Sequence, residues 1–187
     1  MKCLFVLSGI LMISTLSIFP AKAQFIRGNA FELPVVGGEI AFQQLDTAAS
    51  FLQEDYYGLA KNWLEQTFQT RKYQLDDPEK GQLNAEVHFK IDDQQIPQPL
   101  YYTALISFDF KDQVIRLNLH QLTFDKSAAK GKSKRDNRTD VTYQVKEQVR
   151  AGTDTMYPHT WDSLKNYGQG LLAEFRQYVA EASTQKL

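Results

Sequence analysis

The chain has 187 residues, of which 43% are hydrophobic and 23% are charged, and it carries 21 lysines and arginines against 22 aspartates and glutamates. This length is enough for one domain with a proper hydrophobic core. The near-neutral charge argues against nucleic acid as the general partner, because duplex binding requires a net basic face.

Residues 1–23 have the three-part pattern of a secretory signal peptide. Lys2 supplies the positive end, an apolar run follows over residues 4–19, and Ala21-Lys22-Ala23 is the small-x-small tripeptide that a signal peptidase accepts. We therefore expect cleavage between Ala23 and Gln24, export from the cytoplasm, and a periplasmic or envelope-associated mature protein.

Cleavage would also remove Cys3, the only cysteine, so the mature chain could neither form a disulfide nor use a thiol nucleophile. Cys3 precedes the apolar run, whereas the cysteine of a lipoprotein should follow it. The remaining alternative is an uncleaved membrane anchor, which usually needs about 20 strongly apolar residues. Serine, threonine and glycine interrupt this run, and no second run is long enough to span a bilayer.

Residues 24–37 are predicted to be an N-terminal leader segment, and residues 39–45 a first strand. Asp46-Thr47 and Asp55 are possible helix starts, because short oxygen-bearing side chains satisfy free amides there. The clearest helix is predicted over residues 56–68. Its apolar side chains recur at steps of three and four, on one face: Tyr56, Leu59, Ala60, Trp63, Leu64 and Phe68.

Three strands follow, over residues 83–91, 101–110 and 114–124, with apolar and polar side chains alternating. Their short links, including a tight turn at Lys111-Asp112, favour an antiparallel meander. In the third strand, strict alternation places five residues on one side: Val114, Arg116, Asn118, His120 and Leu122.

Residues 126–140 are predicted to be a basic loop, since they carry six cations and no large apolar side chain. A short fourth strand is predicted over residues 141–145. Pro158 then precedes a second long helix, whose apolar residues between Trp161 and Val179 fall near one face. Residues 184–187 are expected to fray as a C-terminal tail.

The sequence resembles an exported Gram-negative bacterial family of unknown function that is described as having a TBP-like fold. The residues that carry the resemblance lie between positions 38 and 124: Ile40, Phe42, Tyr56, Ala60, Trp63, the Lys111-Asp112 turn, Val114 and Arg116. The resemblance implies a curved antiparallel sheet with helices on one face, as in TATA-binding protein. The family has no established activity, so no functional residue carries over.

The expected fold class is therefore α+β: a TBP-like curved antiparallel sheet of about four or five strands, with two long helices packed on one face. We expect a single domain over residues 38–183, with the basic loop as an excursion from it.

His88 and His120 lie on neighbouring predicted strands and could share a zinc ion, with Glu86 and Asp109 completing the ligand set. The alternative is a pair of histidines on a half-exposed sheet. His159 precedes Asp162 and Ser163 at the start of the last helix, but no known catalytic motif includes them, so a capping or turn role is favoured.

Five acidic residues could indicate glycoside hydrolysis, which uses two opposed carboxyl groups. They all lie in predicted loops, where solvated turns explain them: Asp76, Asp77, Glu79, Asp92 and Asp93. Several aromatic residues could line a groove between helix and sheet, although aromatics at helical spacing more often belong to a core: Tyr56, Tyr57, Trp63, Phe68, Tyr73, Tyr101 and Tyr102.

The basic loop could contact an anionic surface such as lipopolysaccharide or phospholipid head groups. The residues that would do so are Lys130, Lys132, Lys134, Arg135 and Arg138. The alternative is a solvated loop without a partner, because no aromatic side chains are interleaved with the cations.

The expected function is an exported, non-enzymatic binding or interaction module with a protein or small-molecule partner. No cofactor or metal is implied by any motif. A hydrolase with a site outside known motifs is the first alternative, in which a histidine lies near a hydroxyl and a carboxylate. An envelope-associated structural protein that uses the basic loop is the second.

Overall fold

The computed structural model describes residues 24–28, 31–47, 51–92, 99–111, 113–125, 138–153 and 158–185. The predicted signal peptide with Ala23 lies outside the described residues. So do four of the five cations proposed for anionic contact: Lys130, Lys132, Lys134 and Arg135.

A six-stranded antiparallel sheet is the centre of the described fold, so the prediction of four or five strands is wrong. Its order is β4-β8-β7-β6-β5, with β9 pairing to β8. The strands are β4 (Phe42–Thr47), β5 (Leu75–Asp77), β6 (Gln82–Ile91), β7 (Leu100–Lys111), β8 (Val114–Asp125) and β9 (Arg138–Asp140). The meander β6-β7-β8 lies within one or two residues of the predicted bounds, because its alternating pattern is long and regular.

The predicted leader segment is itself folded. It supplies β1 (Gln24–Arg27) and β2 (Glu32–Val36), which join β3 (Glu39–Ile40) in a three-stranded antiparallel sheet. Gly37 and Gly38 connect β2 to β3 with φ angles of 61° and 87°. A two-residue hairpin turn with both φ angles positive suits glycine. The Gly-Gly pair is therefore the turn that reverses the chain from β2 into β3.

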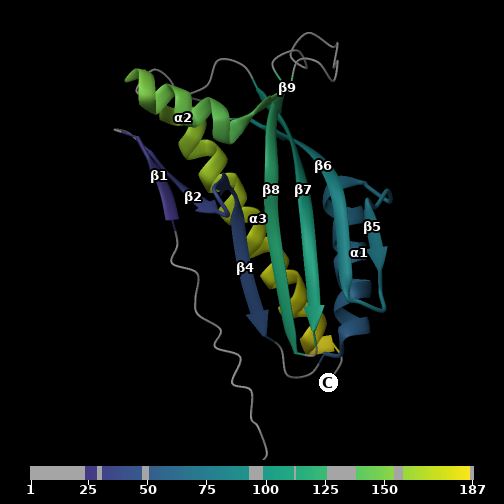
Figure 1. The fold of residues 1–187 in the computed structure, drawn as a ribbon. Helices are drawn as coiled ribbons and strands as arrows, with labels where there is room; N and C mark the ends of the chain where they lie inside the picture. Colours follow the sequence, from purple (N-terminus) through teal and green to yellow (C-terminus); the bar gives the residue numbers. More distant parts are fainter. Residues whose placement is uncertain are drawn as a thin grey trace, which may run out of the picture.

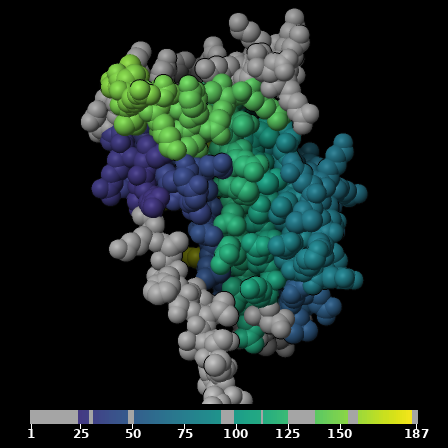
Figure 2. Space-filling model, viewed as in Figure 1, coloured from purple at the N-terminus to yellow at the C-terminus, as the bar shows by residue number. Residues whose placement is uncertain are grey.

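The six-stranded sheet has two chemically different faces. On β6 the odd-numbered residues from Leu83 to Ile91 are buried, whereas Asn84, Glu86, His88 and Lys90 are partly or fully exposed. We call the side that carries these even-numbered residues the polar face. It is turned to the viewer in Figure 2, where neither α1 nor α3 covers it.

A β-bulge in β8 changes the alternation that the sequence predicts. The register runs from His120 opposite Leu105 to Thr123 opposite Thr103, so β8 has one extra residue there. Gln121 takes it up with a φ angle of 51°. Leu122 is consequently only 2% exposed and belongs to the core, and the prediction that it shares a side with His120 is wrong.

The described residues contain three helices rather than the two predicted: α1 (Gln53–Phe68), α2 (Val141–Ala151) and α3 (Pro158–Gln185). Figure 1 shows α1 and α3 behind the strands. The Trp63 ring of α1 lies 6.2 Å from the ring of Phe108 on β7 and 5.0 Å from that of Phe175 on α3.

The start of α1 differs from both predicted starts. Asp46 and Thr47 are the end of β4, and α1 begins after Leu52. The Asp55 carboxylate accepts a hydrogen bond from the Leu52 N–H at 3.0 Å, so it closes the first turn from inside the helix.

Residues 141–145 are the first turns of α2, and the prediction of a strand there is wrong. The Asp140 carboxylate caps the helix by accepting the Tyr143 N–H at 2.6 Å. Val141 and Val145, four residues apart, are both fully buried. Spacing at four residues fits a helix and a strand equally over so short a segment, and the cap decides between them.

One glycine allows α3 to approach the sheet closely. A Cβ added at Gly168 would lie 2.7 Å from the ring of Phe42 on β4, well inside van der Waals contact, whereas a Cβ at Gly58 of α1 would meet nothing within 4 Å. Gly168 therefore allows α3 to lie close to β4, whereas Gly58 marks no such close contact of α1.

We predict opposite effects of alanine at these two helical glycines. Gly168→Ala should lower the free energy of unfolding by about 1–3 kcal/mol, because the buried Phe42 ring has to move. Gly58→Ala should raise it by roughly 0.5–1 kcal/mol through helix propensity. Urea unfolding followed by circular dichroism measures both, and equal effects at the two positions would contradict the close contact.

Candidate functional site

The two sheet histidines both project from the polar face but have separate partners. His88 Nδ1 lies 2.9 Å from Thr103 Oγ1, and His120 Nε2 lies 2.7 Å from Ser107 Oγ. Among the described residues, no group of three or more histidine, cysteine, aspartate or glutamate side chains is placed to hold a metal ion.

The other candidate residues are spread over the molecule. His159 is exposed in the first turn of α3. Asp76 and Asp77 lie in β5 rather than in a loop. Lys61 and then Tyr57 donate hydrogen bonds that lower the pKa of Asp76, and Lys80 does the same for Asp77. These carboxylates therefore serve as partners of nearby cations, and Asp93 lies outside the described residues.

Most of the aromatic residues that were candidates for a groove belong to the core. Tyr56, Tyr57, Trp63 and Tyr102 are each at most 8% exposed. Phe68 and Tyr73 are half-buried and line a cavity. The sequence patterns therefore place the core correctly for most of this set, whereas Phe68 and Tyr73 reach a surface hollow.

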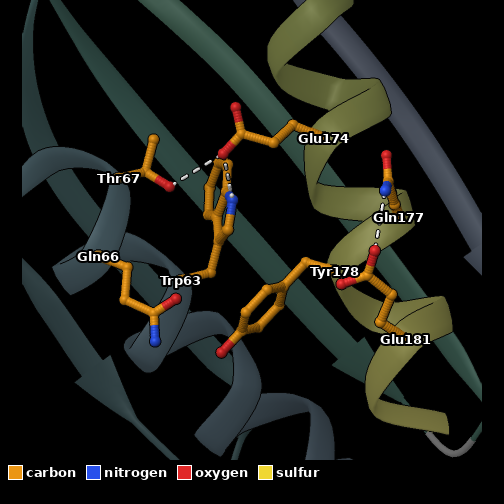
Figure 3. Close-up of a pocket in the computed structure, with 7 residues that line it drawn as sticks. All are labelled: Trp63, Gln66, Thr67, Glu174, Gln177, Tyr178 and Glu181. Atoms are coloured by element: carbon orange, nitrogen blue, oxygen red, sulfur yellow. Dashed lines mark hydrogen bonds between the residues drawn. The ribbon is translucent and has the colours of Figure 1, made fainter. Parts of the chain in front are cut away.

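A cleft of about 410 Å³ lies between α1 and α3. Figure 3 shows the Glu174 carboxylate above the Trp63 indole, with Tyr178 reaching from α3 toward α1. Glu174 Oε1 accepts hydrogen bonds from Trp63 Nε1 and Thr67 Oγ1, each at 3.1 Å, and Gln177 donates to Glu181 at 2.8 Å. These side chains already satisfy one another's hydrogen-bonding groups. We therefore interpret the residues around the cleft as a structural link between α1 and α3.

A larger hollow of about 710 Å³ lies beside β6, and we call it the β6-edge groove. One wall is the segment that connects α1 to β5, and the other is the strand itself. Its lining residues are Phe68, Gln69, Thr70, Arg71, Lys72, Tyr73, Gln74, Glu86, Val87 and His88.

The short length of β5 leaves part of the β6 edge without a neighbouring strand. β5 pairs only with residues 82–84, and the Gln74 N–H donates to the Asn84 carbonyl at 2.8 Å. Successive residues of a strand direct their backbone groups to opposite sides. The N–H and C=O groups of Glu86, His88 and Lys90 therefore face the same side as those of Asn84, and within the described chain no strand pairs with them there.

The charges along the groove are mixed but mainly positive. Arg71 is paired with Glu65, which raises the pKa of the guanidinium, and Lys90 is paired with Asp92 at 2.7 Å. Lys72 is exposed and makes no ion pair with another described residue. Glu86 is the carboxylate of the lining, and its Oε1 lies 3.5 Å from His88 Nε2 and 3.9 Å from Arg138 Nη1.

A second hollow, of about 280 Å³, adjoins the groove at Gln74 and Glu86; we call it the bulge cavity. It surrounds the β8 bulge and includes Arg138, the one anionic-contact candidate that the structure describes. Arg138 begins β9, its side chain is only 22% exposed, and its Nε is buried without a hydrogen-bond partner among the described residues. Arg138 is thus part of the sheet, although the sequence placed it in a solvated loop.

The polar face carries few exposed apolar side chains. The large hydrophobic residues that are exposed in the described chain are Phe25, Val36, Leu45, Leu52 and Tyr143. Of these, only Leu45 belongs to the six-stranded sheet. A contiguous apolar patch would indicate a hydrophobic partner, and the exposed apolar residues of the described chain are scattered instead.

Comparison with solved structures gives a likeness in fold. A TBP-like protein from Parabacteroides distasonis superposes with a TM-score of 0.60 at 8% sequence identity, over 78% of this chain and 96% of that chain. The chain has a TBP-like fold. The α+β class is thereby confirmed, and at this identity the likeness extends to the fold alone.

A DUF4468 family protein from Bacteroides ovatus gives a TM-score of 0.43 at 12% identity, over 68% of this chain and 88% of that chain. No family model matches the sequence, and no curated protein matches it. None of the helices in the described part of the chain combines the length and apolarity that a bilayer crossing requires.

Sequence reasoning missed the connecting segment that forms one wall of the groove. Lys72 and Gln74 stand between a clear helix and a strand of three residues, and no spacing rule marks them. The shortness of β5 was the missing information, because it alone leaves the edge of β6 uncovered.

We predict that Glu174 stabilises the contact between α1 and α3. Glu174→Ala should lower the free energy of unfolding by roughly 1–3 kcal/mol, because it leaves the buried Trp63 N–H without an acceptor. Glu181→Ala is the control, because this substitution removes only the hydrogen bond from Gln177 of the same helix. It should lower the free energy of unfolding by less than about 0.5 kcal/mol. Urea unfolding of both variants tests this, and equal costs would contradict a bridging role.

Proposed function

We propose that this protein is an exported binding module that holds an extended, acidic peptide segment in the β6-edge groove. Export is supported by the signal-peptide pattern of residues 1–23. We also infer that α1 and α3 together form the cover of one sheet face, which leaves the polar face and its edge available to a partner.

The observation that carries the proposal is the uncovered edge of β6 beside a groove of peptide size. An edge strand presents backbone donors and acceptors that an added strand can pair with. This mode of binding draws its affinity from main-chain hydrogen bonds and its selectivity from pockets for alternate side chains. Residues 86–90 offer three such outward-facing residues, and the segment 69–74 supplies the opposite wall.

The preference for an acidic partner follows from the charges that remain after internal pairing. Glu86 has His88 and Arg138 beside it, and the Arg71 and Lys90 cations have carboxylate partners. Lys72 has none among the described residues, so it is the charge most available to a ligand. Opposite charge raises the rate of association and selects among partners.

Fluorescence anisotropy with a labelled octapeptide of alternating glutamate and valine tests the proposal. We expect saturable binding that weakens when glutamate is replaced by lysine, and binding that is lost when alternate backbone nitrogens of the peptide are methylated. Binding that is insensitive to peptide charge and to N-methylation, or no binding, would contradict the proposal.

Two substitutions at one position separate backbone pairing from side-chain contact. His88→Pro should weaken binding by about ten-fold, because proline removes one outward N–H and one such hydrogen bond is worth roughly 0.5–1.5 kcal/mol. His88→Ala keeps the N–H and should bind within about two-fold of the wild type. Similar melting temperatures for the two variants would show that proline leaves the pairing with β7 intact.

Charge reversal gives an independent check. Lys72→Glu should weaken binding of the acidic peptide by about five-fold and reduce its dependence on salt. Lys165→Glu, on α3 away from the groove, is the matched control and should leave binding unchanged. Equal losses in the two variants would show that net charge, not the groove, controls association.

A further inference from the structure

Ser107 and His120 form a hydroxyl–imidazole pair on the polar face, outside the β6-edge groove. Ser107 is on β7, His120 is on β8, and Ser107 Oγ lies 2.7 Å from His120 Nε2. Both side chains are half-buried. With the imidazole proton on Nδ1, the serine hydroxyl donates to Nε2, which is the contact that a serine nucleophile needs with its base.

Two amide side chains flank this serine across the sheet. Asn84 of β6 and Asn118 of β8 are the direct cross-strand partners of Ser107, so all three residues project from the same face. Cross-strand partners have Cβ atoms about 4.5–5.5 Å apart. Each amide group is therefore within reach of an oxygen on a carbon bonded to Ser107 Oγ, the place where an oxyanion would develop.

The surroundings of His120 favour its neutral form. Burial lowers its pKa, and the smaller opposing effect of the Glu39 carboxylate only partly reverses this. A neutral imidazole at pH 7 can accept the serine proton, whereas an imidazolium cannot.

Space for an acyl group adjoins the pair. Leu105, which lies opposite His120 in the register, and Gln121, which follows it in β8, both line the bulge cavity. Glu39 lines the same cavity. His120 is thus next to two residues that line a hollow of about 280 Å³, and a hollow of this size suits a short acyl chain better than a long one.

We propose that Ser107 is a nucleophile toward short-chain carboxylic esters, with His120 as its general base and the amides of Asn84 and Asn118 as oxyanion donors. This activity goes beyond the proposed peptide binding and does not depend on it, since none of these four residues lines the β6-edge groove.

The reaction has two steps, which are acylation of the serine and hydrolysis of the acyl-serine. Ser107 Oγ attacks the ester carbonyl while its proton passes to His120 Nε2. The C–O bond of the leaving alcohol then breaks, and the alkoxide takes that proton. Water hydrolyses the acyl-serine by the same route, with His120 first accepting and then returning a proton, so that a carboxylic acid is released and the serine is restored.

The polar face also contains a natural comparison. His88 and Thr103 form a second imidazole–hydroxyl pair, at 2.9 Å through Nδ1. Thr103 is only 7% exposed and carries the additional methyl group of threonine. This pair is the matched control, because it shares the sheet face and the hydrogen bond but its hydroxyl belongs to a more deeply buried, bulkier residue.

A fluorophosphate ester tests the nucleophile directly, since the serine oxygen bonds to phosphorus while fluoride and the hydroxyl proton leave. We expect intact-mass spectrometry of the purified protein to show one adduct after incubation with diisopropyl fluorophosphate, and peptide mapping to place it on Ser107. Ser107→Ala should abolish the adduct. His120→Gln should slow its formation by about 100-fold, as expected for loss of a general base, and His88→Gln should leave the rate unchanged.

Hydrolysis of p-nitrophenyl acetate tests the oxyanion donors. Asn84→Ala and Asn118→Ala should each lower kcat by about ten-fold or more with little change in KM. Thermal melting identifies any variant that fails to fold, and Ser107→Thr, which keeps a hydroxyl, should retain slow labelling. No adduct on the wild-type protein, or an adduct that survives Ser107→Ala, would overturn the proposal.

Discussion

The separation of the sheet into a buried face and a polar face is the constraint on which the rest of the structure depends. Side chains of β6, β7 and β8 alternate between the two faces, and the buried set meets Trp63 of α1 and Phe175 of α3. Because most apolar side chains lie on one side, the other side can carry amides, hydroxyls, histidines and carboxylates at close range without cost to the core. Both proposed activities use residues of that side or of its edge.

Two departures from regular pairing shape the surface hollows. The bulge at Gln121 turns β8 so that Leu122 enters the core, and it opens the cavity that Arg138 borders. The late start of β5, at Leu75 opposite Asn84, leaves residues 85–91 of β6 without a neighbouring described strand on that side and creates the groove along residues 69–74. A regular six-stranded sheet with full-length edge strands would have neither hollow.

The long, periodic parts of the fold were predictable from the sequence, and the short or irregular parts were not. The meander and the helix over residues 56–68 repeat their pattern often enough to exclude alternatives. Val141 to Val145 repeats it too few times, so the cap supplied by Asp140 was decisive there. A single bulge residue cannot be seen in an alternating pattern, and it moved Leu122 across the sheet.

The candidate sites were harder to predict, for a related physical reason. The prediction that His88 and His120 lie on neighbouring strands is wrong, because β7 runs between β6 and β8 and gives each histidine a hydroxyl partner instead of a shared ligand. Ser107 carried no motif, since its partner is distant in sequence and the two meet only through strand pairing. Lys72 and Gln74 became candidate site residues only because the structure places them across the β6-edge groove from residues 86–88 of β6.

The exposed edge of β6 has a further consequence for self-association. Free edge strands invite pairing between identical molecules, which leads to aggregation. Here Lys72 stands on the facing wall without an ion-pair partner among the described residues, so two copies brought edge to edge would place like charges close together. The charge that we propose attracts an acidic strand would also repel a second copy of the same protein, so that one side chain would act both in recognition and against self-pairing.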